Sequence, residues 1–100
     1  MIKRPEYDLC VVGKNLKRLR EAKNLSVDQV REYLCLGSVQ AVYKYEKGRS
    51  YPQADTMFAL MELYDASLND IVRNYEEDEM SSSFHFILNY RFNDKRKYVC

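Results

Sequence analysis

The chain has 100 residues, a formal net charge of +1 and three cysteines, and 46% of its residues are hydrophobic. This length fits a single domain with a modest core, and no apolar run approaches the roughly 20 residues of a membrane-spanning helix. The first residues lack the apolar stretch of a signal peptide. With one histidine and no CxxC spacing a zinc site is not expected, and we expect free thiols in a reducing cytoplasm.

Charge is unevenly distributed along the chain. Residues 1–52 carry eleven basic and six acidic side chains, whereas residues 53–83 carry one basic and eight acidic ones. The last 17 residues return to a net charge of +3. A basic amino-terminal half indicates a polyanionic partner, although a surface whose charge has no function would show the same asymmetry.

Two helices are predicted near the amino terminus. Residues 1–11 form the expected lead-in, and a helix is predicted over residues 12–23, where apolar residues recur at helical spacing opposite a basic face. Ser26 and Gln29 match a capping box, in which each side chain bonds the backbone amide of the other residue. A second helix is therefore predicted over residues 26–34.

A third helix is predicted over residues 38–47, after a tight turn at residues 35–37 in which Cys35 is expected to be buried. Ser38 is a candidate for its amino-terminal cap. Gly48 stands just past its end, where a left-handed backbone conformation is favoured.

Two further helices are predicted before the composition changes. An apolar helix over residues 54–64 should end at Asp65, and the pair Ser67 and Asp70 should cap a short fifth helix. The predicted helical domain covers residues 12–73. Residues 74–83 are acidic and serine-rich, and are predicted to be a linker.

The last predicted element is an aromatic segment with a basic tail, residues 84–100. Apolar residues alternate strictly at Phe84, Phe86, Leu88, Tyr90 and Phe92, which indicates a β-strand. A lone strand cannot satisfy its backbone, so we expect pairing with the same segment of a second chain, and hence a dimerisation element. A helix folded back on its own domain, or no fixed structure, remains open.

Five short helices, with a tight turn between the second and third, match the helix-turn-helix arrangement. Residues 12–72 resemble the lambda-repressor/Cro-like, or XRE-type, family in the segments "VGKNLKRLREAKNLSVDQV", "AVYKYEKGRSYP" and "TMFALMELYDASLNDIV". The segment "QAVYKYEKGRSYP" is similar to members from low-GC Gram-positive bacteria and their phages. This resemblance implies an all-α, five-helix DNA-binding domain with a short C-terminal extension. The turn is one residue longer than is usual in the family.

The candidate interface centres on the third predicted helix. Val42 and Tyr45 should face the core, which turns the remaining side chains outward. Glutamine can read adenine with two hydrogen bonds, and lysine suits guanine or phosphate. The candidate base contacts are Ser38, Val39, Gln40, Tyr43 and Lys44. The candidate phosphate contacts are Lys14, Lys17, Arg18, Lys47, Arg49 and Ser50. Ordinary solvated positions are the alternative for each of them.

The family resemblance also implies a structural ion pair between Arg20 and Glu46. A partly buried pair would tie the first predicted helix to the third, and loss of one partner would then cost about 3–5 kcal/mol. The alternative is two exposed charges that contribute roughly 0–1 kcal/mol.

The expected function is that of a sequence-specific regulator of transcription, a repressor in preference to an activator, that binds double-stranded DNA. It should bind a palindromic operator as a homodimer and read the major groove with residues 38–47. The alternative is a protein-interaction module, antitoxin-like or part of an anti-repressor system, that no longer reads DNA. No active site can be assembled from the sequence, so an enzyme is not expected. Neither is a cofactor, a small-molecule effector or a membrane partner.

Overall fold

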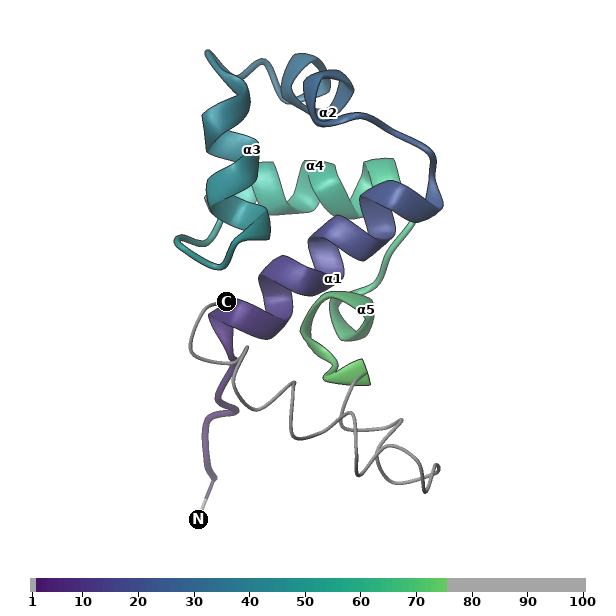
Figure 1. The fold of residues 1–100 in the computed structure, drawn as a ribbon. Coiled ribbons are helices and arrows are strands. Elements are labelled where there is room, and N and C mark those ends of the chain that lie inside the picture. The colour runs from purple at the N-terminus through teal and green to yellow at the C-terminus, as the bar shows by residue number, and fades with distance from the viewer. Residues whose placement is uncertain (1, 76–100) are drawn as a thin grey trace, which may run out of the picture.

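The computed structural model describes residues 2–75, which fold into five α-helices (Figure 1). They are α1 (Leu9–Ala22), α2 (Val27–Tyr33), α3 (Val39–Glu46), α4 (Ala54–Tyr64) and α5 (Leu68–Val72). The described residues contain no strand, and the predicted all-α, five-helix fold is confirmed. The expected strand at residues 84–92, and the linker beyond residue 75, lie outside the described part of the chain.

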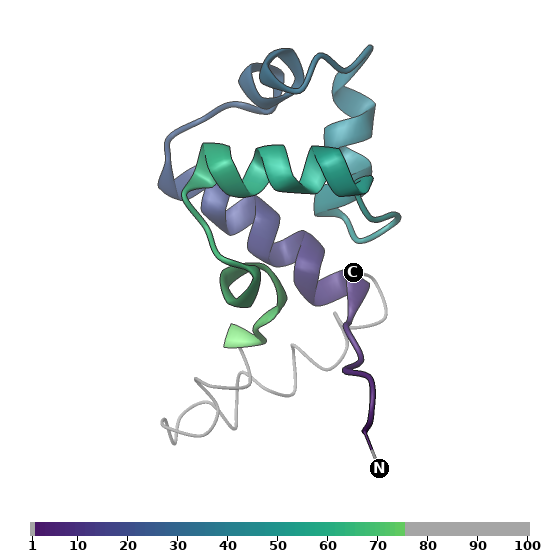
Figure 2. The same ribbon diagram turned by 180° about the vertical axis from the view of Figure 1, so that it is seen from behind.

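The helix α1 is the centre of the arrangement. It packs against both α3 and α5, and α2 packs against α3. Viewed from behind, α4 crosses the molecule between α2 on one side and α1 with α5 on the other (Figure 2). Residues that precede α1 extend away from the helices (Figure 1).

Every helix contributes to one small core. Its buried hydrophobic side chains are Val12, Leu16, Val30, Val42, Leu60, Tyr64 and Ile71. Burial of one such side chain contributes about 1.5–3 kcal/mol. Because α2 and α3 each contribute a single buried hydrophobic residue to this core, Val30 and Val42, much of the surface of both helices is available to solvent or to a partner.

Local capping chemistry sets the helix starts. The capping box predicted for α2 is confirmed, because the Ser26 amide donates to Gln29 Oε1 at 2.8 Å and the Gln29 amide donates to Ser26 Oγ at 3.1 Å. The helix α1 begins three residues earlier than predicted. The physical reason is Asp8, whose carboxylate accepts the amide of Cys10 at 2.9 Å and caps the helix.

Helix ends also follow the sequence. Asn24, Gly48 and Asp65 adopt left-handed φ angles of 57°, 70° and 52° just after α1, α3 and α4. The box that was predicted for α5 also forms, since Ser67 and Asp70 bond each other's backbone amides at 2.9 and 3.3 Å. These caps fix the helix lengths, and hence the position of α3.

Cys35 departs from its predicted burial. Cys35 has a left-handed φ of 58° in the turn after α2 and is exposed, so the predicted burial is wrong. It is a free cysteine, as expected. Cys100 lies outside the described residues, and the thiol states expected for Cys10 and Cys100 stay predictions.

Within residues 2–75 no helix is both long and apolar enough to cross a membrane. The same residues contain no cluster of three or more side chains suited to hold a metal ion.

Candidate nucleic-acid interface

One side of α3 is buried and the other is exposed. Val42 and Glu46, four residues apart, are buried. The side chains on the opposite side are exposed, namely Gln40, Tyr43, Lys44 and Lys47. Because residues three and four apart share a helix face, these side chains form one continuous surface, which we call the α3 outer face.

The amino-terminal end of α3 borders this outer face. Ser38 is exposed and extended, with a φ of −155°. Its side chain makes no capping hydrogen bond, so the predicted side-chain cap is wrong, although Ser38 is the residue that precedes the helix. Val39 is half-buried at the edge between the two sides.

A contact within the outer face orders one of its lysines. The Lys47 Nζ atom lies 5.6 Å from the centre of the Tyr43 ring, within the range of a cation–π interaction. The aromatic ring therefore holds a positive charge at the end of α3, beside the loop that carries Arg49.

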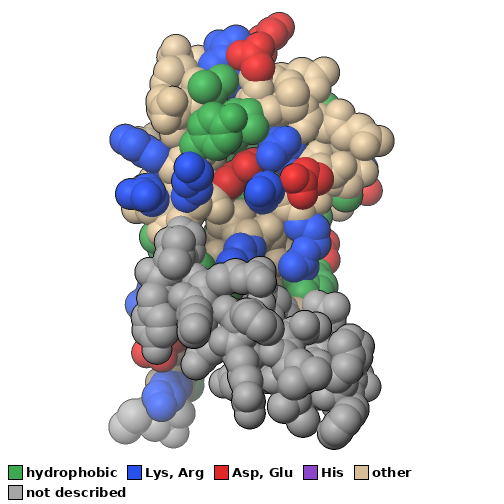
Figure 3. Space-filling view, viewed as in Figure 1, with side chains coloured by type: hydrophobic (Ala, Val, Ile, Leu, Met, Phe, Trp, Pro, Cys, Tyr) green, Lys and Arg blue, Asp and Glu red, His purple; other side chains and the backbone are tan. Residues whose placement is uncertain are grey.

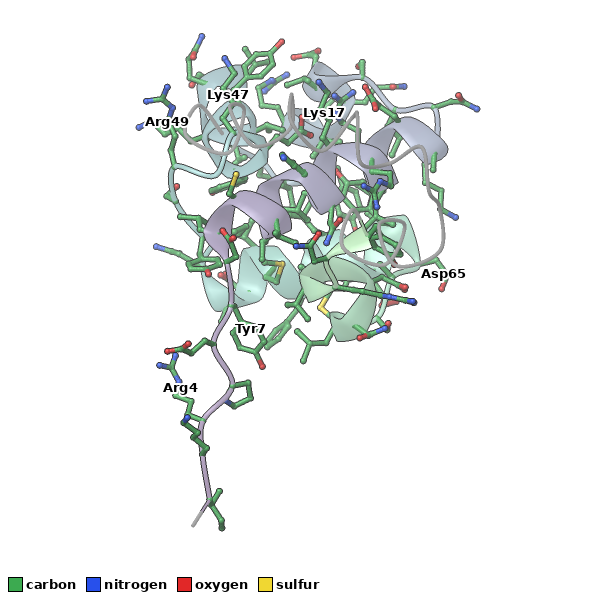
Figure 4. The ribbon with its side chains drawn as sticks, turned by 60° about the horizontal axis from the view of Figure 1, so that its bottom comes forward. Arg4, Tyr7, Lys17, Lys47, Arg49 and Asp65 are labelled. Carbon is green, nitrogen blue, oxygen red and sulfur yellow. The ribbon has the colours of Figure 1, made fainter. Side chains whose placement is uncertain are left out.

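Basic residues from two helices border the α3 outer face. Lys17 of α1, Lys47 and Arg49 project toward the same side of the domain (Figure 4). Figure 3 shows basic side chains across the face where α1 and α3 meet, with acidic side chains between them. Lys17 and Arg49 are exposed, and Ser50 is half-buried.

Gly13 allows α1 and α3 to approach this closely. A Cβ atom at Gly13 would lie 2.6 Å from the Glu46 carbonyl oxygen and 2.8 Å from the Gly48 nitrogen. Both are backbone atoms that cannot rotate away. A residue without a side chain is therefore required where α1 crosses the end of α3.

The ion pair between Arg20 and Glu46 holds the same junction. Arg20 Nε lies 2.7 Å from Glu46 Oε2, and Arg20 Nη2 donates to Oε1 at 3.2 Å. Arg20 Nη1 also donates to the Leu25 carbonyl at 2.8 Å. The hydrogen bond with Glu46 raises the pKa of Arg20. Burial, with the Glu46 charge nearby, raises the pKa of Tyr64.

A second arginine, which the sequence analysis did not single out, braces the turn between α2 and α3. Arg31 Nη1 donates to the Leu36 carbonyl at 3.2 Å, and Arg31 Nε lies 2.7 Å from Asp28 Oδ1. The i,i+3 spacing of Asp28 and Arg31 was the available signal. This brace fixes the direction in which α3 leaves the turn.

Lys14 and Arg18, two of the predicted phosphate contacts, lie on another side of α1. The Arg18 guanidinium carbon stands 4.6 Å from the centre of the Tyr75 ring, and Lys14 and Arg18 line a small hollow with Tyr75. Between them, Asn15 donates to the Ile71 and Arg73 carbonyls at 2.8 and 2.7 Å. These contacts place Lys14 and Arg18 on the side of α1 toward α5, whereas Gly13 marks the side toward α3.

Residues 11–73 match the model of a family described as a helix-turn-helix domain. The structure is similar to the restriction-modification controller protein C.AhdI from Aeromonas hydrophila, with 25% identity, a TM-score of 0.57 and coverage of 64% of this chain and 96% of that one. It is also similar to the clp gene regulator ClgR from C. glutamicum, with 23% identity, a TM-score of 0.57 and coverage of 69% and 88%. No curated protein matches the chain.

Proposed function

We propose a function for this chain, which belongs to the helix-turn-helix domain family whose model matches residues 11–73. The family predicted from the sequence is thereby confirmed, and the narrower resemblance to low-GC Gram-positive members stays a prediction. A helix-turn-helix motif binds DNA through the second of its two helices. Here the motif consists of α2 and α3, so the DNA-binding helix is α3. The family and the two similar structures support a DNA-binding regulator of transcription and not an enzyme.

The specific proposal is that α3 reads base edges in the major groove of double-stranded DNA. The α3 outer face is the observation that carries it, because Gln40 and Lys44 project from the side opposite the buried Val42. A major groove about 12 Å wide admits one helix. In this orientation the exposed Ser38 and the half-buried Val39 lie at the end of the helix that enters the groove, with Tyr43 beside Gln40.

Phosphate contacts would come first from Lys17, Lys47 and Arg49, which project toward one side of the domain (Figure 4). Ser50 adds a hydroxyl beside Arg49. Lys14 and Arg18, on the α5 side of α1, would reach phosphates only at the margin of the site. Such contacts set the register of the protein on DNA and make the affinity dependent on salt.

We further propose that the protein is a cytoplasmic repressor and binds a palindromic operator as a homodimer. One α3 helix can read a single half-site, and a two-fold pair reads both halves of a palindrome. A protein that occupies an operator blocks transcription without any further part, so repression is the simplest form of regulation. DNA as the partner supports a cytoplasmic location.

Titration of the full-length chain with generic duplex DNA at several salt concentrations tests the proposal. Arg49→Ala should weaken binding to all sequences alike and flatten the plot of log affinity against log salt by about one unit. Arg73→Ala, which removes the same charge at the end of α5, is the matched control and should leave this slope unchanged.

Equal loss of slope in both variants would contradict the placement of the interface. Absence of any salt-dependent binding would instead favour the alternative from the sequence, a protein-interaction module that no longer reads DNA.

A further inference from the structure

A shallow hollow of about 560 Å³ lies at the junction of α4 and α5, apart from the α3 outer face. Its apolar lining comes from Phe58, Met61 and Ala66. Phe58 is 66% exposed. Aromatic rings carry a large apolar surface, so Phe58 offers an apolar contact that the described residues leave uncovered.

Carboxylates surround the apolar floor of this hollow. Glu62 and Asp65 are exposed at its rim. Asp70 is held in place by the Ser67 amide at 2.9 Å, and this hydrogen bond lowers the pKa of Asp70 and keeps it ionised. A complementary occupant therefore combines apolar or aromatic side chains with positive charge.

The chain itself contains a segment of this composition. Residues 84–92 alternate aromatic and aliphatic side chains with polar ones, and residues 84–100 carry four basic side chains and one acidic side chain. No basic residue occurs between positions 76 and 83. Among residues 76–100, the segment that begins at Phe84 is therefore the one whose apolar and basic side chains match the apolar and acidic lining of the hollow.

The described chain ends at Tyr75, which contacts one residue of the hollow's lining. Two guanidinium groups lie near the Tyr75 ring centre, that of Arg18 at 4.6 Å and that of Arg73 at 5.3 Å. The Tyr75 hydroxyl donates to Asp70 Oδ1 at 3.4 Å, and Asp70 lines the hollow. The eight residues 76–83 can span up to about 26 Å, which is ample to return to the hollow.

We propose that the hollow between α4 and α5 is the docking site of the chain's own residues 84–92, with an aromatic side chain against Phe58 and Arg91 near Glu62. A short tether gives the segment an effective concentration in the millimolar range. Docking within one chain therefore outcompetes docking of a second copy. This inference is independent of the proposed DNA binding, because it uses none of the α3 outer face.

Amide NMR spectra of the full-length chain test the proposal. Phe58→Ser should shift the resonances of residues 84–92 toward those of an undocked segment. Tyr33→Ser is the matched control, since it removes a 48% exposed aromatic side chain from α2, and it should leave these resonances unchanged. The Phe58→Ser shifts should be the same at much lower protein concentration, because the contact lies within one chain.

An exchange of charges between the hollow and the segment is the second test of docking. Glu62→Lys should weaken docking, and Arg91→Glu added to it should restore the wild-type resonances of residues 84–92. The proposal is overturned if Phe58→Ser leaves those resonances in place while the core resonances show a folded domain. It is also overturned if the contact disappears on dilution, which is the behaviour of a segment that pairs with a second chain.

Discussion

Breaking the Arg20–Glu46 ion pair should destabilise the domain strongly, because both partners are shielded from water. The two side chains are 11% and 5% exposed, and they are joined by contacts of 2.7 and 3.2 Å. Arg20 also bonds the Leu25 carbonyl. One guanidinium therefore connects α1, the loop before α2 and the end of α3.

The expected magnitude follows from this geometry. Removal of one partner of a buried pair costs about 3–5 kcal/mol, because the other charge stays buried without a counterpart. Arg20→Ala should lie at the upper end, since it also leaves the Leu25 carbonyl without its donor. In the double variant Arg20→Ala/Glu46→Ala no unpaired charge remains, so its loss should be smaller than the sum of the single losses by at least about 2 kcal/mol.

Urea titrations followed by far-ultraviolet circular dichroism measure these losses as shifts in midpoint. Asp28→Ala is the control, because it breaks the Arg31–Asp28 pair, whose side chains are 29% and 64% exposed. Its midpoint should move far less. Additive losses of only a few tenths of a kcal/mol for Arg20→Ala and Glu46→Ala would show that the two charges do not form a buried pair.

Three further predictions concern packing, capping and pH. Gly13→Ala should lower the free energy of unfolding by about 1–3 kcal/mol in urea titrations, because the added Cβ would clash with backbone atoms at the end of α3. Gly37→Ala is the control and should cost nothing, because a Cβ there meets no atom within 4 Å. Asn15→Ala should cost about 1–3 kcal/mol and expose the α5 amides to hydrogen exchange, because the buried Ile71 carbonyl and the partly buried Arg73 carbonyl lose their donor. A hydrogen bond from the Ser67 amide lowers the pKa of Asp70 below its ordinary value of 3.8, so the ionised carboxylate stabilises the fold fully above pH 3.8. The difference in urea midpoint between wild type and Asp70→Asn should therefore shrink as the pH falls below 3.8. An unchanged midpoint for Gly13→Ala, unaltered exchange for Asn15→Ala or a constant difference for Asp70→Asn would count against the corresponding contact.

Features set by short-range chemistry could be predicted from the sequence. The Ser26 and Ser67 boxes depend on side chains three residues from their partners, and the stop at Gly48 depends on one backbone angle. The buried and exposed sides of α3 followed from helical periodicity. The cap at Asp8 could have been found by the same rule, because an aspartate there directly precedes an apolar run.

Features set by the meeting of distant segments were harder to predict. The stacking of Arg18 on Tyr75 joins residues 57 positions apart, and nothing local to Arg18 indicates it. The requirement for glycine at position 13 arises only where α1 crosses α3. The pair of Arg20 with Glu46 was predicted, but from the family resemblance and not from spacing.

The proposal that the α3 outer face reads base sequence can be tested by selection of bound duplexes from a random pool. The full-length wild type should select a two-fold symmetric motif. Gln40→Ala should lose preference at one position of each half-site, and lose about 1–3 kcal/mol of binding free energy on the best wild-type site. Selection of the same motif with the same affinity by both proteins would contradict the claim, because a side chain that contacts a base edge cannot be removed without a change in preference.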